Sequence, residues 1–159
     1  MTTKNTDLVA NFEASPQVAN SAAELAGVLR TAHGSVELAA GDSTDNDIVM
    51  LAPIPSNAAV PTLFIGSDTF GGSCTYNVGI YTSAGVVKDE DVFATTVADD
   101  AALADVRFEA ANIDTSRKKM WELAGDTTDP GGYFYIAVTF AATGGTAGTM
   151  AWNISYVVD

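Results

Sequence analysis

The chain has very few of the side chains on which catalysis and metal binding usually depend. It contains one histidine, His33, and one cysteine, Cys74, in 159 residues. A single cysteine excludes an internal disulfide, and neither residue has Cys or His neighbours at the spacing of a metal site. Without a nucleophile motif nearby, His33 is interpreted as a surface or packing residue rather than a general base. The sequence therefore predicts a protein that is not an enzyme and needs no cofactor.

Basic side chains and long apolar runs are also scarce. Seven Lys and Arg residues stand against twenty Asp and Glu residues, which gives a formal net charge of −13. Such a charge repels nucleic acid and anionic membranes, so neither is expected as a partner. No run approaches the roughly 20 apolar residues of a membrane-spanning helix, and the N-terminal residues lack the pattern of a secretory signal. We therefore expect the protein to be made and assembled in a cytoplasm.

Short apolar runs separated by Gly, Asp, Ser and Thr dominate the rest of the chain. Several of these runs alternate apolar and polar residues with the period of two that is typical of strands. A parallel sheet would need a helix after each strand, and the chain lacks these helices. The pattern therefore predicts an all-β fold, an antiparallel two-sheet sandwich of jelly-roll type. Strands are predicted at residues 35–39, 48–51, 60–65, 75–81, 92–97, 106–110, 133–141 and 149–158.

One segment, residues 116–124, has helical rather than strand-like spacing. Thr115 or Ser116 can cap its start, and Gly125 can end it. Three apolar side chains share one side of this segment, namely Met120, Leu123 and Ala124. We expect a short helix that lies across an end of the two sheets.

The first twenty residues are polar and weakly patterned. We interpret residues 1–20 as an extended N-terminal arm and residues 21–159 as a single β-sandwich domain. Residues 21–29 could form a short helix or lead into a strand. The arm could add a strand to an exposed sheet edge of a neighbouring subunit, because backbone hydrogen bonds do not depend on sequence. A terminus without fixed structure is the alternative.

Carboxylates cluster in the loop of residues 41–47. Asp42, Asp45 and Asp47 could place several oxygens around a calcium ion. Their spacing does not match the EF-hand loop, which has Gly at the sixth position and Glu at the twelfth. A solvated acidic loop explains the same residues, so no metal site is expected, and these three aspartates are the only candidates.

Most aromatic side chains fall within predicted strands, where alternate positions face a core. Tyr133, Tyr135 and Trp152 could instead lie on the outer surface of a strand, in a subunit interface or a sugar-binding platform. We favour an interface, because Tyr and Trp are enriched in interface cores. Phe12 and Val18 of the arm complete the set of interface candidates.

Six short motifs follow one another along nearly the whole chain. They are Ala14-Ser15-Pro16-Gln17-Val18, Gly34-Ser35-Val36-Glu37, Ile54-Pro55-Ser56-Asn57-Ala58, Tyr76-Asn77-Val78-Gly79-Ile80-Tyr81, Trp121-Glu122-Leu123 and Asp129-Pro130-Gly131. In this order they resemble a group of tailed-bacteriophage virion structural proteins, which are similar to small β-sandwich capsid decoration or cement proteins. The resemblance rests on the common order of the motifs rather than on any one of them.

The resemblance implies a non-enzymatic structural role. It suggests that the protein binds the outer capsid as a decoration or cement protein that stabilises the head. The implied partners are the major capsid protein and other copies of this chain in a homotrimer, on the outer surface of the virion. A head-fibre or tail-associated module that recognises host surface carbohydrate is the alternative, because such proteins share the sandwich fold.

Overall fold

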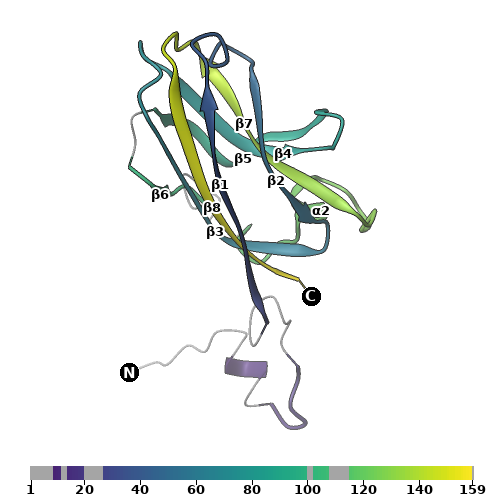
Figure 1. The fold of residues 1–159 in the computed structure, drawn as a ribbon. Helices are drawn as coiled ribbons and strands as arrows, with labels where there is room; N and C mark the ends of the chain where they lie inside the picture. The colour runs from purple at the N-terminus through teal and green to yellow at the C-terminus, as the bar shows by residue number, and fades with distance from the viewer. Residues whose placement is uncertain (1–8, 12–13, 20–26, 100–101, 108–114, 159) are drawn as a thin grey trace.

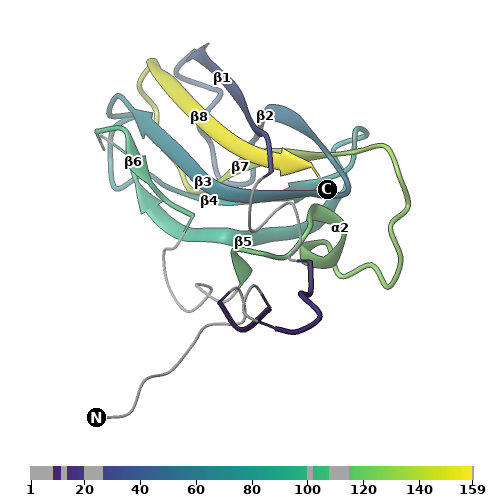
Figure 2. The same ribbon diagram turned by 90° about the horizontal axis from the view of Figure 1, so that it is seen from below.

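The structure is a computed structural model that describes residues 9–11, 14–19, 27–99, 102–107 and 115–158 (Figure 1). These residues form two antiparallel sheets that face each other (Figure 2). Eight strands make up the sheets in the described part of the chain: β1 (Leu29–Leu38), β2 (Ile48–Pro55), β3 (Ala58–Ser67), β4 (Thr75–Tyr81), β5 (Val87–Ala98), β6 (Ala104–Asp105), β7 (Tyr133–Ala142) and β8 (Gly148–Val158).

The strand order identifies the topology. One sheet has the order β1-β8-β3-β6, and the other has the order β2-β7-β4-β5. We refer to them as the β1 sheet and the β2 sheet. Two four-stranded antiparallel sheets with this pair of orders form a jelly roll. The predicted all-β, two-sheet fold is therefore confirmed.

The core lies between the two inner sheet faces. Alternate residues of each strand point into it, as expected for a period of two. Burying one large apolar side chain completely stabilises a fold by about 1.5–3 kcal/mol. The fully buried side chains of the β2 sheet include Tyr76, Val78, Ile80, Ile136, Val138 and Phe140, and those of the β1 sheet include Leu63, Ile65, Met150 and Ile154.

Strand β1 begins earlier than predicted, at Leu29. A glycine after His33, just before the strand predicted at residues 35–39, is typical of a turn, but both His33 and Gly34 lie within β1. Gly34 pairs with Trp152 of β8, and a Cβ atom at position 34 would lie 2.8 Å from the Trp152 ring. A larger residue at position 34 would clash with the indole ring that covers it, so the glycine is explained by this close contact rather than by a turn. Residues 21–26 of the possible helix at 21–29 lie outside the described residues.

The predicted helix is present but shorter than expected. Helix α2 spans only Met120–Leu123 and lies against one end of the sandwich (Figure 1). Met120 and Leu123 are buried, as predicted from their spacing. The helix begins after Lys119, whose backbone N–H donates to a Glu122 carboxylate oxygen 2.8 Å away. Thr115 does not cap it, because the helix begins only at Met120, and the Thr115 hydroxyl instead accepts a hydrogen bond from another side chain.

That side chain is Arg107, which is fully buried. Its Nε donates to the Val60 carbonyl oxygen at 2.8 Å, and its two terminal nitrogens donate to the Thr115 carbonyl at 2.8 Å and the Thr115 hydroxyl at 3.1 Å. The guanidinium also lies 5.1 Å from the centre of the Phe93 ring. Burial lowers the pKa of Arg107 to about 10, and the nearby Asp105 carboxylate opposes this shift. Arg107 therefore ties β3 to the segment that leads into α2.

The prediction of a strand at residues 106–110 is wrong for the residues described there, because Val106 and Arg107 follow β6, which contains only Ala104 and Asp105. Residues 108–110 lie outside the described part of the chain. The described segment leaves the sheet after Asp105 because the next residues turn inward, and both Val106 and Arg107 are buried.

Replacing Arg107 with alanine tests this role. We expect Arg107→Ala to lower the free energy of unfolding by about 3–6 kcal/mol, because two buried carbonyls lose donors at about 1–3 kcal/mol each and a cavity remains. Urea unfolding followed by tryptophan fluorescence measures the change. Lys118→Ala is the control, because this nearby cation is exposed. Equal stability losses in the two variants would contradict the assigned role.

Candidate interface surfaces

Each sheet of the sandwich ends in two edge strands, and three of these four edges are blunted. Strand β6 has only two residues. Strand β2 contains Pro53 and Pro55 and has an irregularity between Met50 and Ala52. Strand β5 departs from regular pairing with β4 at three places. Short strands, prolines and bulges are the usual means by which proteins prevent an edge from pairing with another chain.

Strand β1 has none of these features. It pairs with β8 without a register shift over ten residues, from Leu29 opposite Val157 to Leu38 opposite Gly148. It contains no proline. Within the described residues, β8 is its only strand partner. One side of β1 therefore carries a regular row of backbone N–H and C=O groups without a neighbouring strand.

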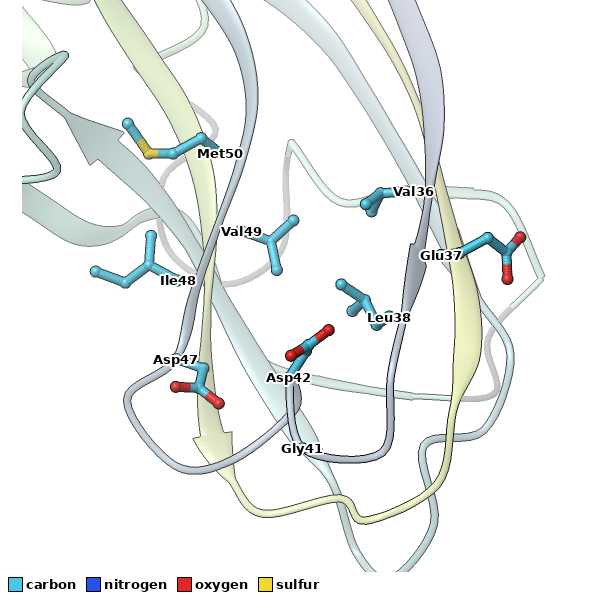
Figure 3. Close-up of a pocket in the computed structure, with 9 residues that line it drawn as sticks. All are labelled: Val36, Glu37, Leu38, Gly41, Asp42, Asp47, Ile48, Val49 and Met50. Carbon is cyan, nitrogen blue, oxygen red and sulfur yellow. The ribbon is translucent and has the colours of Figure 1, made fainter.

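A groove of about 440 Å³ lies beside this edge, between β1 and β2. Figure 3 shows Val36 and Leu38 of β1 pointing toward Val49 of β2 across the groove. Asp42 and Asp47 lie at the end of the groove, on the loop that joins the two strands. The groove thus has apolar walls and an acidic end.

The acidic loop is shaped by its own carboxylates. An Asp42 carboxylate oxygen accepts a hydrogen bond from the Ala39 backbone N–H at 2.9 Å. An Asp47 carboxylate oxygen accepts bonds from the Thr44 hydroxyl and from the Thr44 backbone N–H, and these bonds lower the pKa of Asp47. The Asp45 backbone N–H donates to a threonine hydroxyl of the β7–β8 loop 3.2 Å away. Among the described residues, no three His, Cys, Asp or Glu side chains are grouped to hold a metal ion.

Two predicted interface residues, Tyr133 and Tyr135, lie on the outer face of the β2 sheet. Tyr133 is 64% exposed, and Tyr135 pairs with the exposed Pro53 of β2. Ile48 and Met50 of β2 are exposed, and they pair with Thr139 and Ala137 of β7, which share the face of Tyr135 by strand alternation but are themselves buried. These five residues form the outer patch. The sequence predicted a strand at residues 48–51 but did not identify these two side chains as surface residues.

The other interface candidates lie elsewhere. Trp152 is half-buried, packs against the core and covers Gly34. Val18 is 50% exposed in the arm, and its backbone N–H donates to the Asn11 carbonyl at 3.1 Å. Phe12 lies outside the described residues. The structure therefore places the two tyrosines in the outer patch with residues of β2 that were not predicted as interface residues. Trp152 and Val18 lie on other parts of the molecule.

His33 and Cys74 do not form a reactive pair. His33 is exposed on β1, whereas Cys74 is buried, and burial raises the pKa of its thiol. A raised pKa keeps the thiol protonated and unreactive at neutral pH. In the part of the chain that is described, no helix has the length and apolar character to span a membrane.

Comparison with known proteins supports the fold. No protein-family model and no curated protein sequence matches the chain. A chain in the capsid of Ralstonia phage GP4 is 21% identical, with a TM-score of 0.52 over 84% of this chain and 86% of that chain. A chain in the capsid asymmetric unit of cyanophage Pam1 is 14% identical, with a TM-score of 0.45 over 84% of this chain and 86% of that one. A chain in the capsid of Helicobacter pylori bacteriophage KHP30 is 11% identical, with a TM-score of 0.44 over 82% and 88%.

The likeness to the GP4 chain shows that the fold is one that occurs in a phage capsid. The structural likeness covers most of both chains. The motifs that resemble phage virion structural proteins are likewise spread along nearly the whole of this chain. That resemblance is therefore confirmed at the level of the fold.

Calcium should have no effect on this protein. The carboxylates of Asp42 and Asp47 already accept hydrogen bonds from the loop backbone. We expect thermal unfolding curves in EDTA and in millimolar calcium to coincide, because a ligand that does not bind the folded state cannot stabilise it. Differential scanning calorimetry measures the midpoints. A calcium-dependent rise that is lost in Asp45→Asn would identify the loop as a metal site.

Proposed function

We propose that this protein is a non-enzymatic structural component of a phage virion. In this role it binds the outer capsid as a decoration or cement protein that stabilises the head. The observation that carries the proposal is the jelly roll shared with a chain of the GP4 capsid over 84% of this chain. Jelly rolls also occur in lectins and other proteins, so the fold supports this role together with the motif order in the sequence.

The surface chemistry is compatible with a place on the outside of a shell. The net charge of −13 disfavours contact with packaged nucleic acid and with other acidic particles. The described residues contain no grouped metal ligands, and Cys74 is buried. These features support a structural rather than a catalytic role.

The proposed partners are the major capsid protein and two further copies of this chain. A homotrimer fits the threefold positions of an icosahedral shell, because cyclic symmetry closes its interfaces. In this proposal residues 21–159 form the rigid body and residues 1–20 form the arm that reaches the shell or an adjacent subunit. The outer patch is the second contact surface, because exposed Tyr, Met and Ile side chains are typical of interface cores. Assembly takes place in the host cytoplasm.

A second candidate function is recognition of host surface carbohydrate by a head fibre or tail protein. The exposed Tyr133 lines a hollow of about 430 Å³, together with Thr127 and Thr128. Lys88 and Asp126 line the same hollow and form an ion pair at 2.9 Å. An aromatic ring beside polar side chains is a common arrangement for binding a sugar, which supports this alternative.

Binding to purified shells that lack the protein distinguishes the two functions. We expect saturable binding and an increase in the temperature at which the shells break open. Deleting residues 1–20 should leave the body folded, because the buried apolar core lies within residues 38–157, and should weaken shell binding by about tenfold or more. Cosedimentation measures binding, and circular dichroism confirms the fold.

A Tyr133→Ala variant tests the alternative, because Tyr133 lines the hollow. Retention on host polysaccharide should be absent in both the variant and the wild type. Absence of shell binding, together with polysaccharide retention that Tyr133→Ala abolishes, would contradict the structural role and support the alternative.

A further inference from the structure

The free edge of β1 is the feature that the proposed function leaves unexplained. A long, regular edge strand is a template for pairing with another chain, and proteins usually protect such edges. The other three edges of this sandwich are protected by shortness, prolines or irregular pairing. Only β1 offers ten residues in regular register beside an open groove. We infer that the β1 edge and its groove bind the N-terminal arm of a second copy of this chain, which adds a fifth strand to the β1 sheet.

The groove specifies the pattern that an added strand must have. Successive side chains of a strand point to opposite faces of its sheet. Those on the inner face of the added strand would enter the groove, where Val36, Leu38 and Val49 provide apolar walls (Figure 3). Those on the outer face would lie beside Ser35 and Glu37, which are exposed on β1. An occupant therefore needs apolar residues at every second position.

The arm contains such a pattern at residues 7–14. Polar residues at odd positions alternate with apolar residues at even positions, and Val9 is the one exception. The apolar positions are Leu8, Ala10, Phe12 and Ala14. Residues 9–11 form a helical turn, which must open before this segment can pair. A single turn is marginally stable in water, so its opening costs little compared with a row of new backbone hydrogen bonds.

The arm residues that the structure describes make backbone hydrogen bonds with one another. The Ala14 and Val18 backbone N–H groups both donate to the Asn11 carbonyl, within the arm itself. Figure 1 shows this segment beyond the end of the sandwich where β1 begins, whereas the groove lies toward the other end, beside the β1–β2 loop. The arm is thus placed to extend toward a neighbour rather than back along its own β1.

Charge favours contact through the arm rather than through the body. Residues 1–20 contain one basic and two acidic side chains, a sum of −1, which leaves −12 of the total of −13 on residues 21–159. Two copies of residues 21–159 therefore repel each other electrostatically. Contact through a nearly neutral arm adds little to this repulsion. Residues 15–28 can span up to about 46 Å when extended, which exceeds the length of about 33 Å of a ten-residue strand. Donation from each copy to the next closes into a ring.

Light scattering of the purified full-length protein tests this inference without any shells, so its result is independent of capsid binding. We expect wild-type protein to assemble as its concentration rises. The Val36→Lys variant should assemble only at a protein concentration at least about tenfold higher than wild type. The reason is that the lysine charge would be desolvated in the occupied groove. Ser35→Lys adds the same charge to the neighbouring residue on the outer face and should assemble like wild type.

A second matched pair lies in the arm. Phe12→Lys should weaken assembly by a similar factor, whereas Asn11→Lys, at the adjacent polar position, should not. Hydrogen exchange provides a readout that does not depend on the folding of Val36→Lys. Backbone amides of β1 should exchange about tenfold or more slowly in concentrated than in dilute wild-type protein.

Three results would overturn the inference. The first is a strict monomer at all concentrations, and if β1 is protected in that monomer, the chain's own arm occupies the edge. The second is assembly without added protection of β1, which would place the contact on another surface. The third is equal assembly of the two arm variants, Phe12→Lys and Asn11→Lys.

Discussion

The inner faces of the two sheets can be removed from water only by packing against each other, and the rest of the structure follows from this constraint. Aromatic rings fill the end of the core near the β1–β2 loop, where Phe140 packs edge-on against Phe70 at 5.5 Å and against Tyr76 at 6.3 Å between ring centres. Such pairs add to the stability that burial provides. Because most inner-face side chains are used in this packing, contacts with other molecules depend on the outer faces, the edges and the loops.

The edges differ in a way that has consequences for assembly. A two-sheet sandwich cannot remove its edges as a closed barrel does, so each edge must be protected or paired. Strands β2, β5 and β6 are protected by local sequence or geometry, whereas β1 is regular over its whole length. The outer patch next to β2 adds exposed apolar surface on the same molecule. An acidic body with one open edge and one apolar patch is well suited to become part of a larger particle.

The sequence predicted the parts of the fold that depend on local alternation, such as the strand at residues 133–141, and the fold class followed from them. It could not predict features that depend on distant residues. Gly34 suggested a turn, but its role is set by the Trp152 ring, which is far away in the sequence. Thr115 suggested a helix cap, but its hydroxyl is taken by the buried Arg107. The groove and the open edge were not predictable, because they arise from the strand order rather than from any motif.

The most direct test of the account is an electron cryomicroscopy map of a particle that carries this protein. Density for the jelly roll is expected on the outer surface of the head, at threefold or quasi-threefold positions, in contact with the major capsid protein. Density for the protein confined to the tail or to a host-binding fibre would contradict this placement.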